Sequence, residues 1–165
     1  MFLKATELLP EDVLVYPILV TCPGCKAKAT VTAKNFSTMQ WDAKDVRVVC
    51  ANCGFYKELK DFPTQMITNS QGKKTPVYGY SVGIPFDPFF KIPLFLQTKC
   101  CGDVLWAYNS FHIEILKEYV VTKLRKRSTS SNLNRSIASR LPQWIKSSGN
   151  REQVLKGLET LEKMV

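Results

Sequence analysis

Two Cys-x2-Cys pairs constrain this chain of 165 residues more than any other feature of its sequence. Cys22 and Cys25 enclose Pro-Gly, Cys50 and Cys53 enclose Ala-Asn, and 24 residues separate the two pairs. Each tight turn can supply two thiolates, and four sulfurs complete the tetrahedron that Zn²⁺ prefers. Pro, Gly and Asn are typical of such turns. The spacing therefore predicts one Zn²⁺ bound by Cys22, Cys25, Cys50 and Cys53.

A metal with four protein ligands has no open position for water, so we expect a structural role rather than a catalytic one. Two other interpretations of the pairs stay open. They can be unrelated buried thiols, or one can be a redox Cys-x-x-Cys motif. A dithiol oxidoreductase needs its pair at the start of a helix, whereas Gly54 follows the second pair here. The 24-residue interval also exceeds the commonest spacing of a zinc ribbon.

Short runs of β-branched and aromatic residues, separated by Pro, Gly and Asn, dominate the chain up to residue 108. We expect a polar, exposed loop at 68–76. The segment 78–95, rich in aromatic residues and proline, is either a loop that covers the sheet or a ligand or peptide groove. The expected strands are 13–21, 29–33, 46–51, 55–59, 77–82, 92–98 and 104–108.

Helical periodicity begins after Asn109, which is the expected N-cap, with Ser110 as the alternative. A second apolar stripe covers 133–145 and is interrupted at Pro142. A last helix is expected after Asn150, with Gln153 at the capping-box position. These patterns predict an α+β fold: a β-rich N-terminal part with a four-cysteine zinc ribbon at 1–108, followed by a C-terminal helical tail of two to three helices at 109–165.

Several further stretches accompany the two cysteine pairs, namely 36–41 (FSTMQW), 96–102 (LQTKCCG), 105–109 (LWAYN) and 138–146 (ASRLPQWIK). With these stretches the chain resembles bacterial zinc-ribbon proteins that are described as containing a transcription-factor-IIB-type ribbon. The resemblance covers most of the chain and implies a ribbon with a helical tail. It also implies an association with nucleic acid, although zinc ribbons serve as protein-binding modules too.

Cys100, Cys101 and His112 raise the possibility of a second metal site. Neighbouring side chains on a strand point to opposite faces, so both sulfurs can reach one ion only if the chain turns there. The alternatives are a tight turn with one buried thiol, or a reactive thiol. His112 is the only histidine. An enzyme would need it to lie in a cleft with Asp87 or Asp103, and no catalytic motif supports that arrangement, so we expect no enzymatic activity.

The formal charge of +9 is unevenly distributed, with +3 in residues 1–108 and +6 in residues 109–165. Four thiolates and Zn²⁺ would together contribute −2, which lowers the total to +7 and the first half to +1. The tail therefore carries most of the excess charge. Its cations either favour helix dipoles in solvent or contact phosphates. The candidate nucleic-acid residues are Lys123, Arg125, Lys126, Arg127, Arg135, Arg140 and Lys146.

A second candidate patch on the ribbon interleaves cations with aromatic residues, which either stack on bases or form the small core of the ribbon. This patch comprises Lys26, Lys28, Lys34, Arg47, Lys57 and Lys60 with Phe36, Trp41, Phe55 and Tyr56.

Our leading hypothesis from the sequence is a non-enzymatic, cytoplasmic zinc-ribbon protein that binds nucleic acid with weak sequence specificity. The alternative is a protein-interaction adaptor that docks a partner through 78–95 or the amphipathic C-terminal helices. A leader with a basic start and a long apolar run is absent from the N-terminus, and no apolar stretch reaches 18 residues, so we expect no membrane partner. Nothing in the sequence indicates a small-molecule substrate.

Overall fold

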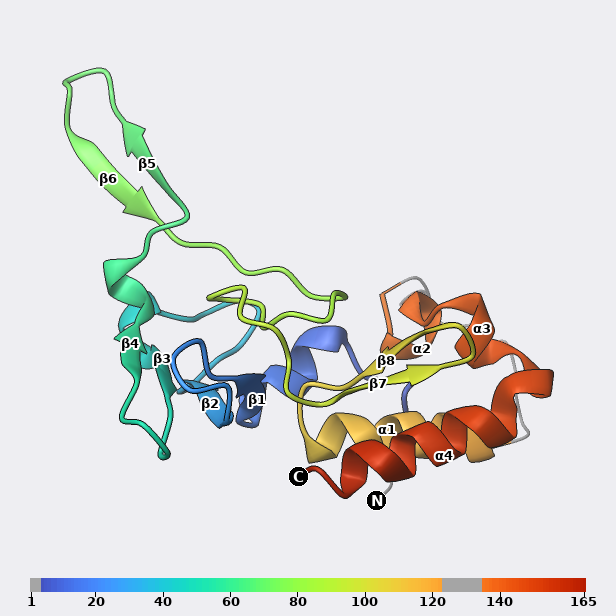
Figure 1. Cartoon of the computed structure of the whole chain (residues 1–165). Helices are drawn as coiled ribbons and strands as arrows, with labels where there is room; N and C mark the ends of the chain where they lie inside the picture. Colours follow the sequence, from blue (N-terminus) through green and yellow to red (C-terminus); the bar gives the residue numbers. More distant parts are fainter. Residues whose placement is uncertain (1–3, 123–134) are drawn as a thin grey trace.

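The computed structural model describes residues 4–122 and 135–165, and it has the expected α+β architecture, with antiparallel strands followed by helices (Figure 1). A four-stranded sheet comes first, in the order β1-β2-β3-β4. Its strands are β1 (Ile18–Thr21), β2 (Lys28–Ala33), β3 (Val46–Val49) and β4 (Tyr56–Glu58). Alternate residues such as Val20, Val31 and Val48 are buried, because successive strand side chains point to opposite faces and one face covers the core.

The expected strand at 13–21 is wrong in its first half. Residues Pro10–Val15 form a 3-10 helix, and β1 begins only at Ile18. Pro10 occupies the first helical position, where its fixed φ is favourable and its missing N–H costs no hydrogen bond. The carboxylate of Asp12 accepts the N–H of Leu9 at 2.7 Å and closes this turn. A proline and a local side-chain bond thus override the strand preference of the valines.

Strands β5 (Gln65–Thr68) and β6 (Lys74–Val77) form a hairpin that projects from the rest of the molecule (Figure 1). The expectation of an exposed loop at 68–76 was right about exposure, but residue 68 ends β5 and 74–76 belong to β6. The expected strand at 77–82 was wrong beyond residue 77, and β5 was missed. All of β5 is exposed, so its sequence lacks the alternation of a half-buried strand that makes such strands predictable.

A second hairpin joins β7 (Gln97–Cys100) to β8 (Asp103–Trp106) through a two-residue turn. Cys101 and Gly102 occupy the turn with φ of 55° and 80°, as a type I′ turn requires. Residues 92–96, expected to be part of this strand, instead run beside the edge of β1, where Phe95 N–H donates to Leu19 O at 2.9 Å. That bond protects an otherwise open edge of the sheet.

The helices are α1 (Ser110–Val121), α2 (Ile137–Arg140), α3 (Gln143–Lys146) and α4 (Arg151–Glu162). Asn109 caps α1 as expected, because its side-chain oxygen accepts the N–H of His112 at 2.9 Å. Asn150 precedes α4, but the expected capping box does not form. The Nδ2 of Asn150 donates to Trp144 O at 3.0 Å instead. The side chain of Gln153 accepts a hydrogen bond from Cys101 Sγ.

One buried cluster includes residues from both sides of residue 108. Helices α1 and α4 lie side by side below the β7–β8 hairpin (Figure 1), and α4 packs against both strands of that hairpin. Farther along, Ile137 N–H donates to Leu8 O at 2.8 Å, and Ala138 N–H donates to Ala5 O at 3.0 Å. The division into 1–108 and 109–165 stays a prediction based on composition.

Candidate metal centre

The two cysteine pairs form nearly identical turns. Cys22 O accepts the N–H of Lys26 at 2.9 Å, and Cys50 O accepts the N–H of Gly54 at 2.9 Å. Lys26 and Gly54 both have left-handed backbones, with φ of 65° and 76°. Each turn begins directly after a strand, the first after β1 and the second after β3, and the sheet holds these strands close together. The four cysteines are therefore positioned by short local bonds and by the pairing of β2 with both β1 and β3.

The four sulfur atoms lie within 4.8 Å of one another. Cys22 Sγ and Cys53 Sγ are 3.6 Å apart, as are Cys25 Sγ and Cys50 Sγ. A tetrahedral ion with metal–sulfur bonds of about 2.3 Å requires sulfurs roughly 3.8 Å apart. The observed spacing is close to that value, so the four predicted cysteines can hold one metal ion.

Polar groups around Cys22 and Cys25 favour the thiolate form that binds metal, whereas the neighbouring cysteines raise the pKa of Cys53 to about 12. The backbone N–H of Cys25 lowers the pKa of Cys22. The carboxamide of Asn52, whose Nδ2 lies 3.4 Å from Cys25 Sγ, lowers the pKa of Cys25 to about 6, with help from the backbone N–H of Ala27. Hydrogen bonds to a charged group stabilise that form. These donors would also stabilise the sulfurs in a complex with a metal.

Cys100, Cys101 and His112 do not form a comparable cluster. Cys100 Sγ and Cys101 Sγ are 3.5 Å apart, because the type I′ turn brings both to one side, and Cys101 Sγ donates to Gln153 Oε1 at 3.2 Å. His112 Nδ1 instead accepts the N–H of Tyr108 at 3.3 Å. Within 4–122 and 135–165, the four predicted cysteines are the only group of three or more potential ligand side chains.

Asp87 and Asp103, the acidic residues that an enzyme would need, accept hydrogen bonds from backbone N–H groups. The buried carboxylate of Asp87 accepts the N–H groups of Phe89, Phe90 and Ile92 at 2.6–2.9 Å. Asp103 Oδ1 accepts the N–H of Val104 at 2.8 Å. Burial lowers the pKa of His112 to about 4, so its ring is neutral at pH 7. Each group is held by hydrogen bonds that stabilise a turn.

Of the candidate nucleic-acid residues, Lys123, Arg125, Lys126 and Arg127 lie outside the described residues. Arg135 and Arg140 are exposed, and Lys146 is half-buried. Lys146 Nζ donates to Ser139 O at 3.2 Å, which places it beside the end of α2 where Arg140 lies. In the described part of the chain, none of these three cations has a carboxylate partner within 4.0 Å.

The residues of the ribbon patch lie in different surroundings. Phe36 and Trp41 belong to an aromatic cluster with Tyr80 and Phe89, whose ring centroids are 5.2–6.3 Å apart. Phe36 is buried in the core and Trp41 packs half-buried against it, so both rings are engaged within the protein. Three of the six cations have polar partners: Lys60 with Glu58, Lys28 with Val165 O and Lys26 with Pro23 O. Lys57 is placed differently, with its ammonium 4.6 Å from the ring centroid of Phe62 and 5.6 Å from that of Phe55.

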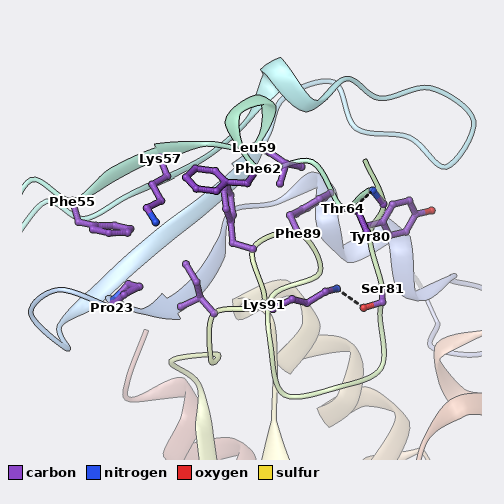
Figure 2. Close-up of a pocket in the computed structure, with 13 residues that line it drawn as sticks. Pro23, Phe55, Lys57, Leu59, Phe62, Thr64, Tyr80, Ser81, Phe89 and Lys91 are labelled. Atoms are coloured by element: carbon purple, nitrogen blue, oxygen red, sulfur yellow. Dashed lines mark hydrogen bonds between the residues drawn. The ribbon is translucent and has the colours of Figure 1, made fainter. Parts of the chain in front are cut away.

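Lys57 and its two aromatic neighbours form one wall of a cleft of about 660 Å³, and the segment 79–92 supplies the opposite wall (Figure 2). The sequence singled out Lys57 and the aromatic segment separately. One interpretation of 78–95 was a ligand or peptide groove, but the opposite wall comes from a segment far away in the chain, so no local pattern predicted that Lys57 faces this segment.

Comparison with protein-family models, with curated proteins and with solved structures finds no match. The resemblance to the transcription-factor-IIB-type ribbon proteins therefore stays a prediction. No helix in the described ranges is both long and apolar enough to cross a membrane.

Proposed function

We propose that this protein is a non-enzymatic zinc-binding protein that contacts the phosphates of nucleic acid with little dependence on base sequence. In this proposal the zinc ion is structural, and the cations of the helical part supply the affinity.

The observation that carries the nucleic-acid proposal is the charge of the segment 119–151, which contains eight Lys and Arg residues and no Asp or Glu. Its described candidates Arg135, Arg140 and Lys146 have no carboxylate partner among the described residues. Unpaired cations that meet phosphates release condensed counterions, and this release supplies most of the affinity of nonspecific binding.

Zinc is proposed from the ligand set. Four thiolates in tetrahedral spacing suit Zn²⁺ or iron, and a site without an open position suits a structural ion. Elemental analysis of the purified protein should give one zinc per chain. Iron in place of zinc would contradict the assignment, and a second zinc would implicate Cys100 and Cys101.

The nucleic-acid proposal is tested by measuring affinity for single- and double-stranded oligonucleotides across a range of salt concentrations. Affinity should fall steeply as salt rises. Replacing Arg135, Arg140 and Lys146 together by Gln should flatten the salt slope by about 2 for single strands, since each lost phosphate contact removes roughly 0.7.

A matched control replaces Lys156 and Lys163, cations of the same half that lie outside 119–151, by Gln. This variant should bind as the wild type does. Absence of binding at low salt, or a flat salt dependence in the wild type, would refute the proposal.

The rival function is the docking of a protein partner. The hairpin β5–β6 favours it, because Met66 and Ile67 are 51% and 49% exposed on opposite faces of a two-stranded ribbon. Such ribbons are marginally stable by themselves. A stoichiometric partner that resists nuclease, and is lost when Met66 and Ile67 become Thr, would favour docking over nucleic-acid binding.

A further inference from the structure

The cleft beside the metal centre combines aromatic walls with two cations. Pro23 of the first cysteine turn and Phe55 of the second line one end, and Phe62 and Tyr80 line the region near the base of the β5–β6 hairpin (Figure 2). Its volume of about 660 Å³ lies in the range of ligand sites. Phe62 is 45% exposed, so one of these rings is open to a ligand.

The charged side chains that line the cleft are all positive. Its lining includes Lys57 and Lys91 and no acidic side chain. The ammonium of Lys57 lies between the rings of Phe55 and Phe62. Lys91 Nζ donates to Ser81 Oγ and to Pro88 O, two neutral acceptors.

Asp87 is the nearest carboxylate in sequence to Lys91, but it is fully buried and accepts three backbone N–H groups. Its hydrogen-bonding capacity is largely used within its own turn. Asp87 still attracts the ammonium of Lys91 electrostatically, whereas Lys57 has no carboxylate partner among the described residues, so Lys57 is the more available cation for an anionic ligand.

From this combination we infer that the cleft binds an unpaired segment of nucleic acid, with bases against the ring of Phe62 and phosphates at Lys57 and Lys91. Aromatic rings beside cations are the usual means of holding single strands, because every base has a face that can stack. A base within a duplex is already stacked on its neighbours and cannot reach these rings. The inference rests on the proposed function and narrows its ligand to single-stranded DNA or RNA.

The location of the cleft links this binding to the metal. Cys22 and Cys25 flank Pro23, and Phe55 follows Cys53 by two residues, so the metal-bound turns fix one end of the cleft. Removal of the metal should therefore abolish binding at the cleft even where the basic segment is intact.

The test is the affinity of the full, zinc-loaded chain for an oligothymidine of about ten nucleotides and for a duplex of the same length. Replacing Phe62 by Ala should weaken oligothymidine binding roughly 5- to 100-fold, the range for loss of one stacked base. Replacing Lys57 by Ala should lower the salt slope by about 0.7. Duplex binding should change much less in both variants.

Matched controls are Phe86→Ala and Lys99→Ala, which remove a ring and a cation that are exposed but do not line the cleft. Zinc content and circular dichroism establish that each variant is folded. NMR titration gives a second readout, in which the amide signals of Lys57, Phe62 and Lys91 should shift on addition of oligothymidine.

The possible results separate this inference from the function on which it rests. If the cleft variants bind as the controls do, while the Arg135, Arg140 and Lys146 variant loses affinity, the cleft inference is wrong and the proposed function stands. Equal losses for duplex and single strand, or equal binding of an acidic peptide in the cleft, would also overturn the inference. No oligonucleotide binding at low salt would refute both.

Discussion

His112 makes the stability of this protein sensitive to mild acid. Its side chain is 6% exposed, and the ring stacks on Tyr108 with centroids 5.4 Å apart and contacts Trp106 at 5.8 Å. The N–H of Tyr108 donates to Nδ1, so that nitrogen is an acceptor and the proton of the neutral ring is on Nε2. Protonation of the folded state is therefore unfavourable.

The size of the effect follows from the two pKa values. Burial lowers the pKa of His112 to about 4 in the folded protein, whereas an unfolded chain has a value near 6.5. Below pH 6.5 the unfolded state binds a proton that the folded state does not, so stability falls as pH falls. The loss attributable to His112 is about 1.4 kcal/mol between roughly pH 7.5 and 5.5, and it approaches about 3.4 kcal/mol below pH 4.

Urea unfolding at about pH 7.5 and 5.5, with zinc in excess, measures this loss. The matched variant is His112→Asn, whose Oδ1 can accept the N–H of Tyr108 but does not titrate. It should lose about 1.4 kcal/mol less than the wild type over the same interval, while metal release and carboxylate protonation affect both proteins equally. Identical pH dependence in the two proteins would refute the view that His112 is buried in the neutral form.

Three further predictions concern the backbone, the packing and the metal ligands. Gly54→Ala should destabilise the protein by about 1 kcal/mol because φ is +76° there, whereas Lys26→Gly, at φ of 65° in the equivalent turn, should be neutral or stabilising in thermal unfolding. Gly157→Ala should lower the free energy of unfolding by about 1 kcal/mol despite the helix preference of Ala, because the added Cβ would lie 2.7 Å from Cδ2 of the buried Leu105. An unchanged or raised free energy of unfolding would contradict that close packing. Cys53→Ser should reduce bound zinc well below one per chain by elemental analysis, and full zinc retention would remove Cys53 from the ligand set.

The cysteine turns were predictable because their chemistry is local. Each turn closes within about five residues, and each pair supplies half of a tetrahedron whatever the rest of the chain does. The helix after Asn109 was predictable for the same reason, since its cap and its apolar repeat lie within one segment. Because these features are local, the candidate metal ligands and the fold class could be predicted from the sequence.

Other expectations failed where tertiary contacts outweighed local preference. Residues 92–96 have strand-like composition, but they run along the edge of β1 and do not belong to the β7–β8 hairpin. Gln153 stands at a capping-box position, yet its side chain bonds with Cys101 from a hairpin that is distant in sequence. In both cases a partner more than 50 residues away decided the outcome.

The sequence by itself therefore determined the four candidate metal ligands, the order of strands before helices and the excess of positive charge in the helical part. Only the tertiary structure decided that Cys100 and Cys101 stand apart from His112, that Phe36 and Trp41 pack in one aromatic cluster, and that Lys57 faces a cleft shared with Lys91. The physical reason is the range of the contacts. A turn and a helix cap depend on neighbours along the chain, whereas a cleft depends on which distant segments the core brings together.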